Sequence, residues 1–470
     1  MKQAFASHRN IRIIIIAIIY LLLAIKRDSS LPLTHFANPE TATLINALLA
    51  LFILTLLIIY ALPLNKLPEF LKKYSLKVKK LPVLTILTVC NLLQIGFTDF
   101  LFIYENNTHK DIYQLNYPVF FLMIFLALLL LLLPLSKLMI FKKLGIASIF
   151  SASLALMLIP ILFFPISAKV TDLLPIIGKQ LDSFTSGTNI YQYYLLDNGI
   201  IAQTVRQPGM FLSYLPVYLL NMDLRWANVF YTLLTGFFIW KSYRYLTNSR
   251  NSSAKNFQEI YLLLSLFLLS PYRIIRSDLY DPVFWLLLSI SIYFLIRKKL
   301  LGFTISYAMA IFVQVWAWLF APFFAVFLLK TYPLKKALLT VCGYLAMGFG
   351  MLAIFILREP RSYLEHIFGF YQKANIDTGY TITTMYFSRF LEILQLSKLA
   401  FPLQLISTAA GFIVAITKKL NLPKMLLLLA FLFFFFIQFI SISWNYMYFT
   451  ATLLLTWHFI LTYHQNKHLV

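Results

Sequence analysis

The stretch Val119–Ser136, VFFLMIFLALLLLLLPLS, decides the fold class of this chain, because it holds no charged residue over the length of a membrane span. A helix needs roughly 18 to 20 apolar residues to cross the hydrocarbon core of a bilayer. Comparable uncharged runs occupy Ile13–Ile25, Val83–Thr98 and Met425–Ile440. The strands of a membrane barrel would instead alternate apolar and polar residues. The sequence therefore predicts an all-α polytopic membrane protein.

The composition agrees with this class of protein. Of the 470 residues, 60% are hydrophobic and 12% are charged, whereas charged residues make up about 25% of an ordinary soluble domain. Apolar runs separated by polar breaks predict a bundle of about fourteen spans. Two long polar segments, 167–224 and 358–398, are predicted to form outer loops. Within them, Phe211–Leu220 and Tyr363–Tyr371 are predicted to form short helices along the membrane surface.

The net charge of +23 follows from basic clusters in alternate loops, which favour the cytoplasmic side and contact anionic lipid. We therefore expect membrane lipid, and no nucleic acid, as a partner. This orientation places both termini in the cytoplasm. Of the 17 Asp and Glu, it leaves only Glu69 and Glu259 on the inner side, so the carboxylates gather at the outer face. The inner basic clusters include Lys72-Lys73, Lys142-Lys143, Arg244 with Arg250, Arg297-Lys298-Lys299, Lys335-Lys336 and Lys418-Lys419.

Asp172 is the leading candidate for catalysis. It follows an apolar run by only a few residues, so its carboxylate is expected at the lipid–water boundary, where a charge usually has a function. A carboxylate in that place can act as general base toward a hydroxyl. The alternative is a helix N-cap, since Thr171-Asp172 precedes Leu-Leu-Pro.

A second candidate site is a short charged segment before the apolar run that starts at Pro282. Its charged residues are Arg273, Arg276, Asp278 and Asp281. Arginine is suited to holding a phosphate. The alternative is an ion-pair cluster that caps the following span.

A third candidate is Gln314, which lies with Trp316 and Trp318 at a predicted break between two spans. A broken helix with polar groups often lines a cavity. The alternative is a pair of tryptophans at the membrane interface.

Motifs of soluble enzymes are missing from the sequence. It contains no glycine-rich nucleotide loop and no His-Glu-x-x-His zinc motif. The seven His are scattered, and both Cys lie in apolar segments. We therefore expect neither a metal site nor a cofactor.

Thr171-Asp172 is followed by Gly187 with Asn189-Ile190-Tyr191, and then by Gln207-Pro208-Gly209. This order of polar motifs resembles membrane glycosyltransferases of the GT-C type, and most closely the polyprenyl-phosphate-mannose-dependent group, glycosyltransferase family 87. Ile190 stands where the family has proline, and Gln314 where a lysine is common. The resemblance covers about residues 146–463. It predicts a GT-C-like core at 146–470, preceded by an extra N-terminal membrane region at 1–145 with about four spans.

This resemblance implies an inverting hexosyltransferase that works on the outer face of the membrane. A polyprenyl-phosphate hexose, such as a mannose, would be the donor, and an envelope glycan or lipid-linked molecule the acceptor. Asp172 would be the base, and the acceptor loop would include Asn189, Tyr191 and Arg206. Donor phosphate or substrate binding would fall to Arg273, Arg276, Asp278, Asp281, Gln314 and Lys373. The donor is a substrate, so the resemblance implies no cofactor.

Two alternatives remain open at this point. Asp99, followed by Asp111-Ile112-Tyr113, repeats the pattern of the Asp172 loop in shorter form and is the alternative base. The alternative function is a transporter or flippase, or a polymerase, of lipid-linked envelope precursors. Transporters tend to carry ionisable residues within their spans, and the spans predicted here hold almost none.

Overall fold

The structure is a computed structural model of the 470-residue chain. It describes residues 15–16, 18–23, 39–61, 117–132, 145–163, 166, 173–199, 201–248, 281–369, 387–440 and 447–465. This part of the chain is 83% helical and 2% strand, which confirms the predominantly helical fold. Three helical segments within it are long and apolar enough to cross a membrane: Thr43–Ala61, Leu334–Arg358 and Ser397–Thr417. These segments identify a membrane protein, and the larger number of about fourteen spans stays a prediction.

The chain forms two compact units, each of which is discontinuous in sequence. The central unit consists of His109–Tyr245 and Pro271–Gly379. The terminal unit consists of Met1–Thr108, Leu246–Ser270 and Tyr380–Val470. The predicted division at residue 145 rests on sequence resemblance and stays a prediction.

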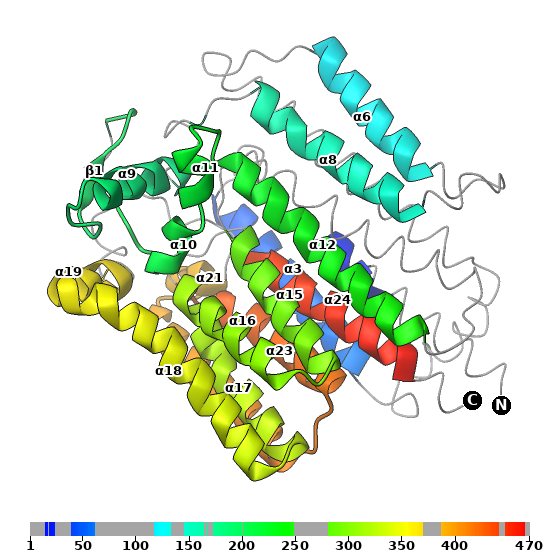
Figure 1. The fold of residues 1–470 in the computed structure, drawn as a ribbon. Helices are drawn as coiled ribbons and strands as arrows, with labels where there is room; N and C mark the ends of the chain where they lie inside the picture. Colours follow the sequence, from blue (N-terminus) through cyan, green and yellow to red (C-terminus); the bar gives the residue numbers. More distant parts are fainter. Residues whose placement is uncertain are drawn as a thin grey trace. The chain divides into compact units, whose positions relative to one another are not determined.

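The central unit begins with two adjacent helices, α6 (Tyr117–Leu132) and α8 (Gly145–Phe163), and continues into a compact polar segment (Figure 1). That segment contains α9 (Leu173–Thr185), the strands β1 (Tyr193–Leu195) and β2 (Ile201–Gln203), and the short helices α10 (Pro208–Leu212) and α11 (Leu215–Leu219). Helix α12 (Arg225–Asn248) follows. The surface helix predicted at 211–220 is therefore two short helices, and proline in the first turn of each favours a helix start there.

The two strands form an antiparallel hairpin in which Tyr194 pairs with Ala202. Their inward side chains, Tyr194 and Ala202, pack with Leu196 against Ile176 of α9. Alternate residues of a strand face opposite sides, so Tyr193 and Leu195 are left exposed. The hairpin adds a small strand element that the apolar pattern of the sequence did not predict.

The rest of the central unit is a set of apolar helices followed by a short distorted turn. It comprises α15 (Pro282–Ile296), α16 (Leu300–Val313), α17 (Trp316–Thr331), α18 (Leu334–Arg358), α19 (Pro360–Leu364) and the π-helix η4 (Glu365–Gly369). Helices α15 and α18 both pack on α16 (Figure 1). Close packing of α18 on α16 depends on Gly348, where an added Cβ would lie 2.8 Å from Cγ2 of Ile311.

The terminal unit contains helical residues at 15–16 and 18–23. Its further helices are α3 (Pro39–Ala61), α21 (Phe387–Ile393), the 3-10 turn η5 (Ser397–Leu399), α22 (Ala400–Thr417), α23 (Leu422–Ile437) and α24 (Met447–Gln465). His458 of α24 joins two other helices through its ring nitrogens. Nδ1 lies 2.7 Å from the carbonyl oxygen of Pro423, and Nε2 lies 3.1 Å from the Tyr60 hydroxyl. Both ring nitrogens thus have partners, which explains how a histidine is accommodated in an apolar interior.

Replacing Gly348 should separate α16 from α18. We expect Gly348→Leu to lower the free energy of unfolding by roughly 1–3 kcal/mol, because the added side chain overpacks a buried contact. Thermal unfolding of the purified protein in detergent measures the change. Gly350→Leu is the matched control, since an added Cβ there meets nothing within 4 Å. Equal melting temperatures for the two variants would contradict the close packing.

Candidate functional site

Asp281 is a buried carboxylate directly before helix α15. Its exposed fraction is 1%, although Asp is rarely buried unless it is paired. Oδ1 accepts a hydrogen bond of 2.8 Å from the side-chain nitrogen of Gln314. Oδ2 has no hydrogen-bond partner among the described residues. Among the described residues, therefore, only one of the two carboxylate oxygens is hydrogen-bonded.

Gln314 reaches Asp281 because the helix is broken at this residue. Helix α16 ends at Val313 and α17 begins at Trp316, with Gln314 in an extended conformation between them (φ −148°, ψ 132°). The side-chain oxygen of Gln314 accepts a hydrogen bond of 3.1 Å from the backbone nitrogen of Val315. Its side-chain nitrogen is then directed to the carboxylate. The break predicted from the sequence is present, and it presents an amide donor to a buried acid.

Arg206 supplies the positive charge that accompanies Asp281. It lies between strand β2 and helix α10 and is 4% exposed. Burial raises the pKa of the Asp281 carboxyl from 3.8 to about 6, while the positive charge of Arg206 and the Gln314 hydrogen bond limit the rise. An acid whose pKa lies near neutrality, beside a buried cation, is typical of functional sites.

The backbone brings Arg206 to this place through a tight contact between α10 and α16. An added Cβ at Gly209 would lie 2.6 Å from Cδ1 and 2.8 Å from the carbonyl oxygen of Phe312. Only a residue without a side chain permits this approach. The contact sets Arg206 and Gln207 next to the helix break at Gln314.

Gln207 connects this group to the second polar segment. Its side-chain oxygen accepts a hydrogen bond of 2.7 Å from the Tyr363 hydroxyl of α19. Burial raises the pKa of Tyr363 to about 12, so the hydroxyl remains a donor at neutral pH. The side-chain nitrogen of Gln207 has no partner within the described part of the chain. We call Arg206, Gln207, Asp281, Gln314 and Tyr363 the Asp281 cluster.

Tyr191 borders the Asp281 cluster through aromatic contacts. Its ring packs edge-to-face on Tyr363, with 5.2 Å between centroids, and lies 6.4 Å from the ring of His366. The side-chain oxygen of Asn189 accepts a hydrogen bond of 2.8 Å from the Tyr191 backbone nitrogen. This local turn directs Tyr191 inward, where burial raises the pKa of its hydroxyl well above 10.0.

The two polar segments are joined at a second point, at the end of α18. Arg358 donates a hydrogen bond of 2.6 Å from Nη2 to the carbonyl oxygen of Gly187. The ring of Tyr193 lies 5.0 Å from that of His366. Segment 187–207 is thus held against segment 358–366 by hydrogen bonds and ring contacts at once.

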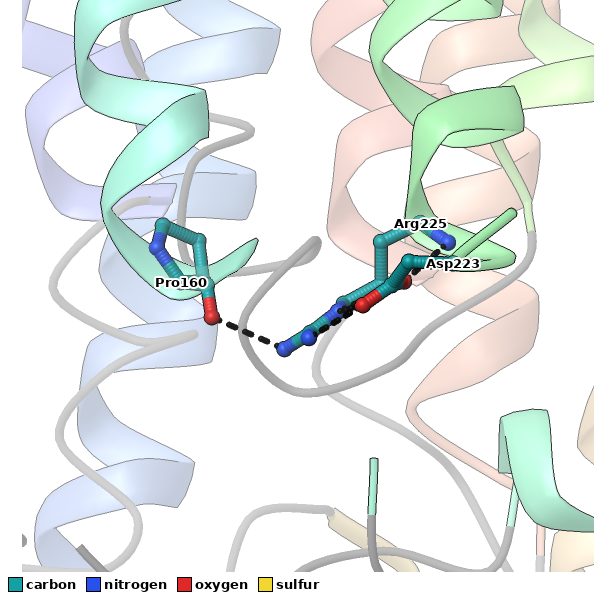
Figure 2. A network of polar contacts seen from close by, with 3 residues as sticks. All are labelled: Pro160, Asp223 and Arg225. Carbon is teal, nitrogen blue, oxygen red and sulfur yellow. Dashed lines mark hydrogen bonds and ion pairs between the residues drawn. The ribbon is translucent and has the colours of Figure 1, made fainter. Parts of the chain in front are cut away.

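Asp223 and Arg225 form a separate polar group, shown in Figure 2. Nε of Arg225 lies 3.0 and 3.1 Å from the two carboxylate oxygens of Asp223. Nη1 of Arg225 donates a hydrogen bond of 2.9 Å to the carbonyl oxygen of Pro160, in the last turn of α8 (Figure 2). The arginine therefore caps α8 and fixes the start of α12. Its role is structural.

The structure brings together four of the predicted site residues. Arg206, Asp281 and Gln314 belong to the Asp281 cluster, and Tyr191 borders it. Asn189 orients Tyr191. The other predicted residues lie outside the described part of the chain: Asp99, Asp172, Arg273, Arg276, Asp278 and Lys373.

Sequence reasoning missed Gln207 and Tyr363 as partners of this site. They are 156 positions apart, and no local pattern links an amide in one loop to a hydroxyl in another. Within the described ranges, no group of three His, Cys, Asp or Glu is placed to hold a metal ion. The Asp281 cluster itself offers a carboxyl, a guanidinium, a tyrosine hydroxyl and amide groups, which suit a polar or anionic ligand.

Replacing Asp281 should alter the pH dependence of stability. The folded carboxyl holds its proton up to about pH 6 and the unfolded one up to 3.8, so the native state binds more protons in this interval. The stabilisation is complete below the unfolded pKa and is lost as pH rises through the folded pKa. Asn does not titrate, so we expect Asp281→Asn to abolish this pH-dependent decrease in the free energy of unfolding, which is on the order of 2–3 kcal/mol in the wild type. Unfolding at several pH values measures this, and identical pH profiles for both proteins would contradict it.

Replacing Tyr363 should loosen the connection between the two polar segments. Tyr363→Phe leaves the buried oxygen of Gln207 without its donor, and we expect a loss of about 1–3 kcal/mol of stability. Tyr193→Phe is the matched control, because Tyr193 is exposed in the same region. Chemical or thermal unfolding in detergent compares the variants. A loss as large in the control would show that the hydrogen bond is not the cause.

Comparison with known proteins identifies no relative of this chain. No family model matches the chain, and comparisons with curated proteins and with solved structures find no match. The resemblance to glycosyltransferase family 87 therefore stays a prediction from the residue pattern, and a function has to be argued from the Asp281 cluster itself.

Proposed function

We propose that this protein is an integral membrane glycosyltransferase that moves a hexose, such as mannose, from a polyprenyl-phosphate donor to an acceptor hydroxyl. The acceptor would be an envelope glycan or a lipid-linked molecule at the outer face. The observation that supports this most directly is the buried group of Arg206, Asp281 and Gln314 at a break between apolar helices. The order and spacing of the Asp172 loop give the same reading from the sequence.

The chemistry of such a transfer asks for groups of the kind found in the cluster. The leaving group is a phosphate that bears negative charge, and a fixed cation in a water-poor site stabilises charge better than the same cation in water. In the proposal, Arg206 holds this phosphate. The free oxygen of Asp281 and the side-chain nitrogen of Gln207 offer one acceptor and one donor for sugar hydroxyls.

The acceptor hydroxyl has to lose a proton as it attacks the anomeric carbon. In the proposal, Asp172 takes this proton, with Asp99 as the alternative base. Asp281 has a different role: with Gln314 on one oxygen and Arg206 nearby, it holds the donor sugar in position. The hydrogen bond between Tyr363 and Gln207 holds the two polar segments together around the ligand.

Transfer of label from a polyprenyl-phosphate hexose to membrane lipid extract by the purified protein in detergent tests the proposal. We expect Arg206→Gln and Asp281→Asn each to reduce the rate about 100-fold or more, as for loss of one charge-stabilising group. Asp172→Asn and Asp99→Asn decide between the two bases. Asp197→Asn, an exposed acid in the hairpin turn, is the control and should keep the wild-type rate.

A clear alternative result would overturn the enzyme assignment. Absence of transfer from any donor, together with movement of a lipid-linked precursor across liposomes that contain the protein, would favour a flippase. Full transfer activity in Arg206→Gln and Asp281→Asn would place the reaction away from the Asp281 cluster.

A further inference from the structure

Three buried polar atoms of α9 and the segment that follows it have no hydrogen-bond partner among the described residues. They are the side-chain nitrogen of Gln180 and the hydroxyl oxygens of Tyr191 and Thr204. Gln180 and Thr204 are 1% exposed, and Tyr191 is 2% exposed. An unpaired polar atom in an interior costs free energy, because its hydration is lost and nothing replaces it. We call Gln180, Tyr191 and Thr204 the neutral polar group.

Thr204 lies between the hairpin and the Asp281 cluster. Burial alternates along the segment that continues from β2: Ala202, Thr204 and Arg206 are buried, and the residues between them are partly exposed. Alternate residues of an extended chain face the same side. Ala202 packs against α9, and Arg206 lies near Asp281. The Thr204 hydroxyl is therefore on the inner side, between these two contacts.

Gln180 faces the same region from α9. Residues 176, 180 and 183 are spaced by four and three positions, so they share one face of the helix. Ile176 packs on the hairpin, and the hydroxyl of Ser183 accepts a hydrogen bond of 3.3 Å from the Tyr194 hydroxyl. Gln180 lies between these two residues along the helix and is therefore directed toward the hairpin.

The Tyr191 hydroxyl connects the hairpin with the Asp281 cluster. It lies close enough to the hydroxyls of Tyr194 and Tyr363 for both to affect its ionisation. Tyr194 belongs to the hairpin core, and Tyr363 donates a hydrogen bond to Gln207. The neutral polar group thus borders the Asp281 cluster and extends from it along the inner face of the hairpin.

The chemistry of the neutral polar group suits sugar hydroxyls. Its side chains are uncharged, since Gln and Thr do not ionise and burial raises the pKa of Tyr191 well above 10.0. The amide nitrogen donates hydrogen bonds, and the two hydroxyls both donate and accept them. A sugar hydroxyl has the same two capacities, whereas an anion would be drawn to the charge of Arg206.

We propose that the acceptor is a saccharide, one sugar ring of which binds at the neutral polar group, next to the donor sugar at Asp281 and Gln207. This inference rests on the proposed function, because it names the chemical class of the acceptor in that reaction. A lipid alcohol without a sugar would leave the three polar atoms unpaired.

Entry of the ring requires the hairpin to move away from α9. The hairpin packs on α9 through a small apolar core, formed by Ile176, Tyr194, Leu196 and Ala202. Segments that bury little apolar surface open locally at low cost in free energy. Binding of the sugar would then supply the partners that the neutral polar group lacks.

The melting temperature tests whether the polar atoms are unpaired. Tyr191→Phe and Thr204→Val each remove an unpaired oxygen, so we expect each to raise the melting temperature of the protein without saccharide by about 2–4 °C. Tyr194→Phe is the matched control. The Tyr194 hydroxyl donates a hydrogen bond of 2.9 Å to the carbonyl oxygen of Ile190, and its removal should lower the melting temperature. A decrease for Tyr191→Phe and Thr204→Val as well would overturn the proposal.

Binding of octyl glycosides of mannose, glucose and galactose, with octanol as the probe that lacks a sugar, tests for the saccharide. The full chain is purified in lauryldimethylamine oxide, a detergent without sugar, and no donor is added. We expect at least one glycoside, and not octanol, to raise the melting temperature of the wild type. Tyr191→Phe and Thr204→Val should each weaken that binding about 3- to 10-fold. Thr185→Val removes an exposed hydroxyl of α9 and should bind as the wild type does.

The remaining outcomes separate this inference from the proposed function. Binding of no glycoside, or equal effects of the glycosides and octanol, would overturn the saccharide site even if transfer activity is present. Higher melting temperatures of the variants with unchanged affinity for the glycoside would show that water alone pairs these atoms, and would also overturn it. Glycoside binding that Tyr191→Phe and Thr204→Val weaken, in a protein that transfers no sugar, would support the saccharide site and contradict the proposed function.

Discussion

Burial of the Asp281 carboxyl is the constraint on which the arrangement of the central unit's polar segments depends. An isolated carboxylate is strongly disfavoured in an apolar interior, and it is tolerated only with charge and hydrogen bonds nearby. Three separate parts of the chain meet this requirement: the loop after β2 brings Arg206, the break before α17 brings Gln314, and the start of α15 brings the acid itself. The helix break is therefore one of the features that make a buried acid possible.

The Asp281 cluster also connects the two polar segments, 187–207 and 358–366. Gln207 contacts Tyr363 by one side-chain oxygen, and Arg358 contacts the backbone at Gly187. Ring contacts of Tyr191 and Tyr193 lie between these two hydrogen bonds. Such a network of contacts, spread over two segments, favours a single conformation of the loop. The geometry around Asp281 therefore depends on residues that never contact it.

The helices, the helix break and the acid before Pro282 could be predicted from the sequence, because each depends on residues that are neighbours in the chain. Apolar runs predict helices, and Gln314 followed by two tryptophans where two apolar runs meet predicts a break, which the ends of α16 and α17 confirm. The acid before Pro282 was a candidate because charge near an apolar run is unusual. The turn at Asn189 and the pairing of Gln207 with Tyr363 were not predictable in the same way. The hairpin is short, and the Tyr363 contact joins positions whose proximity is fixed only by tertiary packing.

The parallel course of α12 and α15 has an electrical consequence. Phe238 of α12 packs on Tyr293 of α15, and Tyr245 meets Arg297 further along both helices. Cations end both helices, whereas at their starts Asp223 is paired with Arg225 and Asp281 lies near Arg206. The side-chain charge is therefore positive at one end and close to neutral at the other, which opposes the smaller dipole of the peptide groups. In a membrane with a negative interior, each unit charge moved across it changes the energy by about 2.3 kcal/mol per 100 mV. The electric potential therefore favours one direction of insertion, with the cations inside. Under the proposed function, this direction would place the Asp281 cluster at the outer face, where the lipid-linked donor would bind.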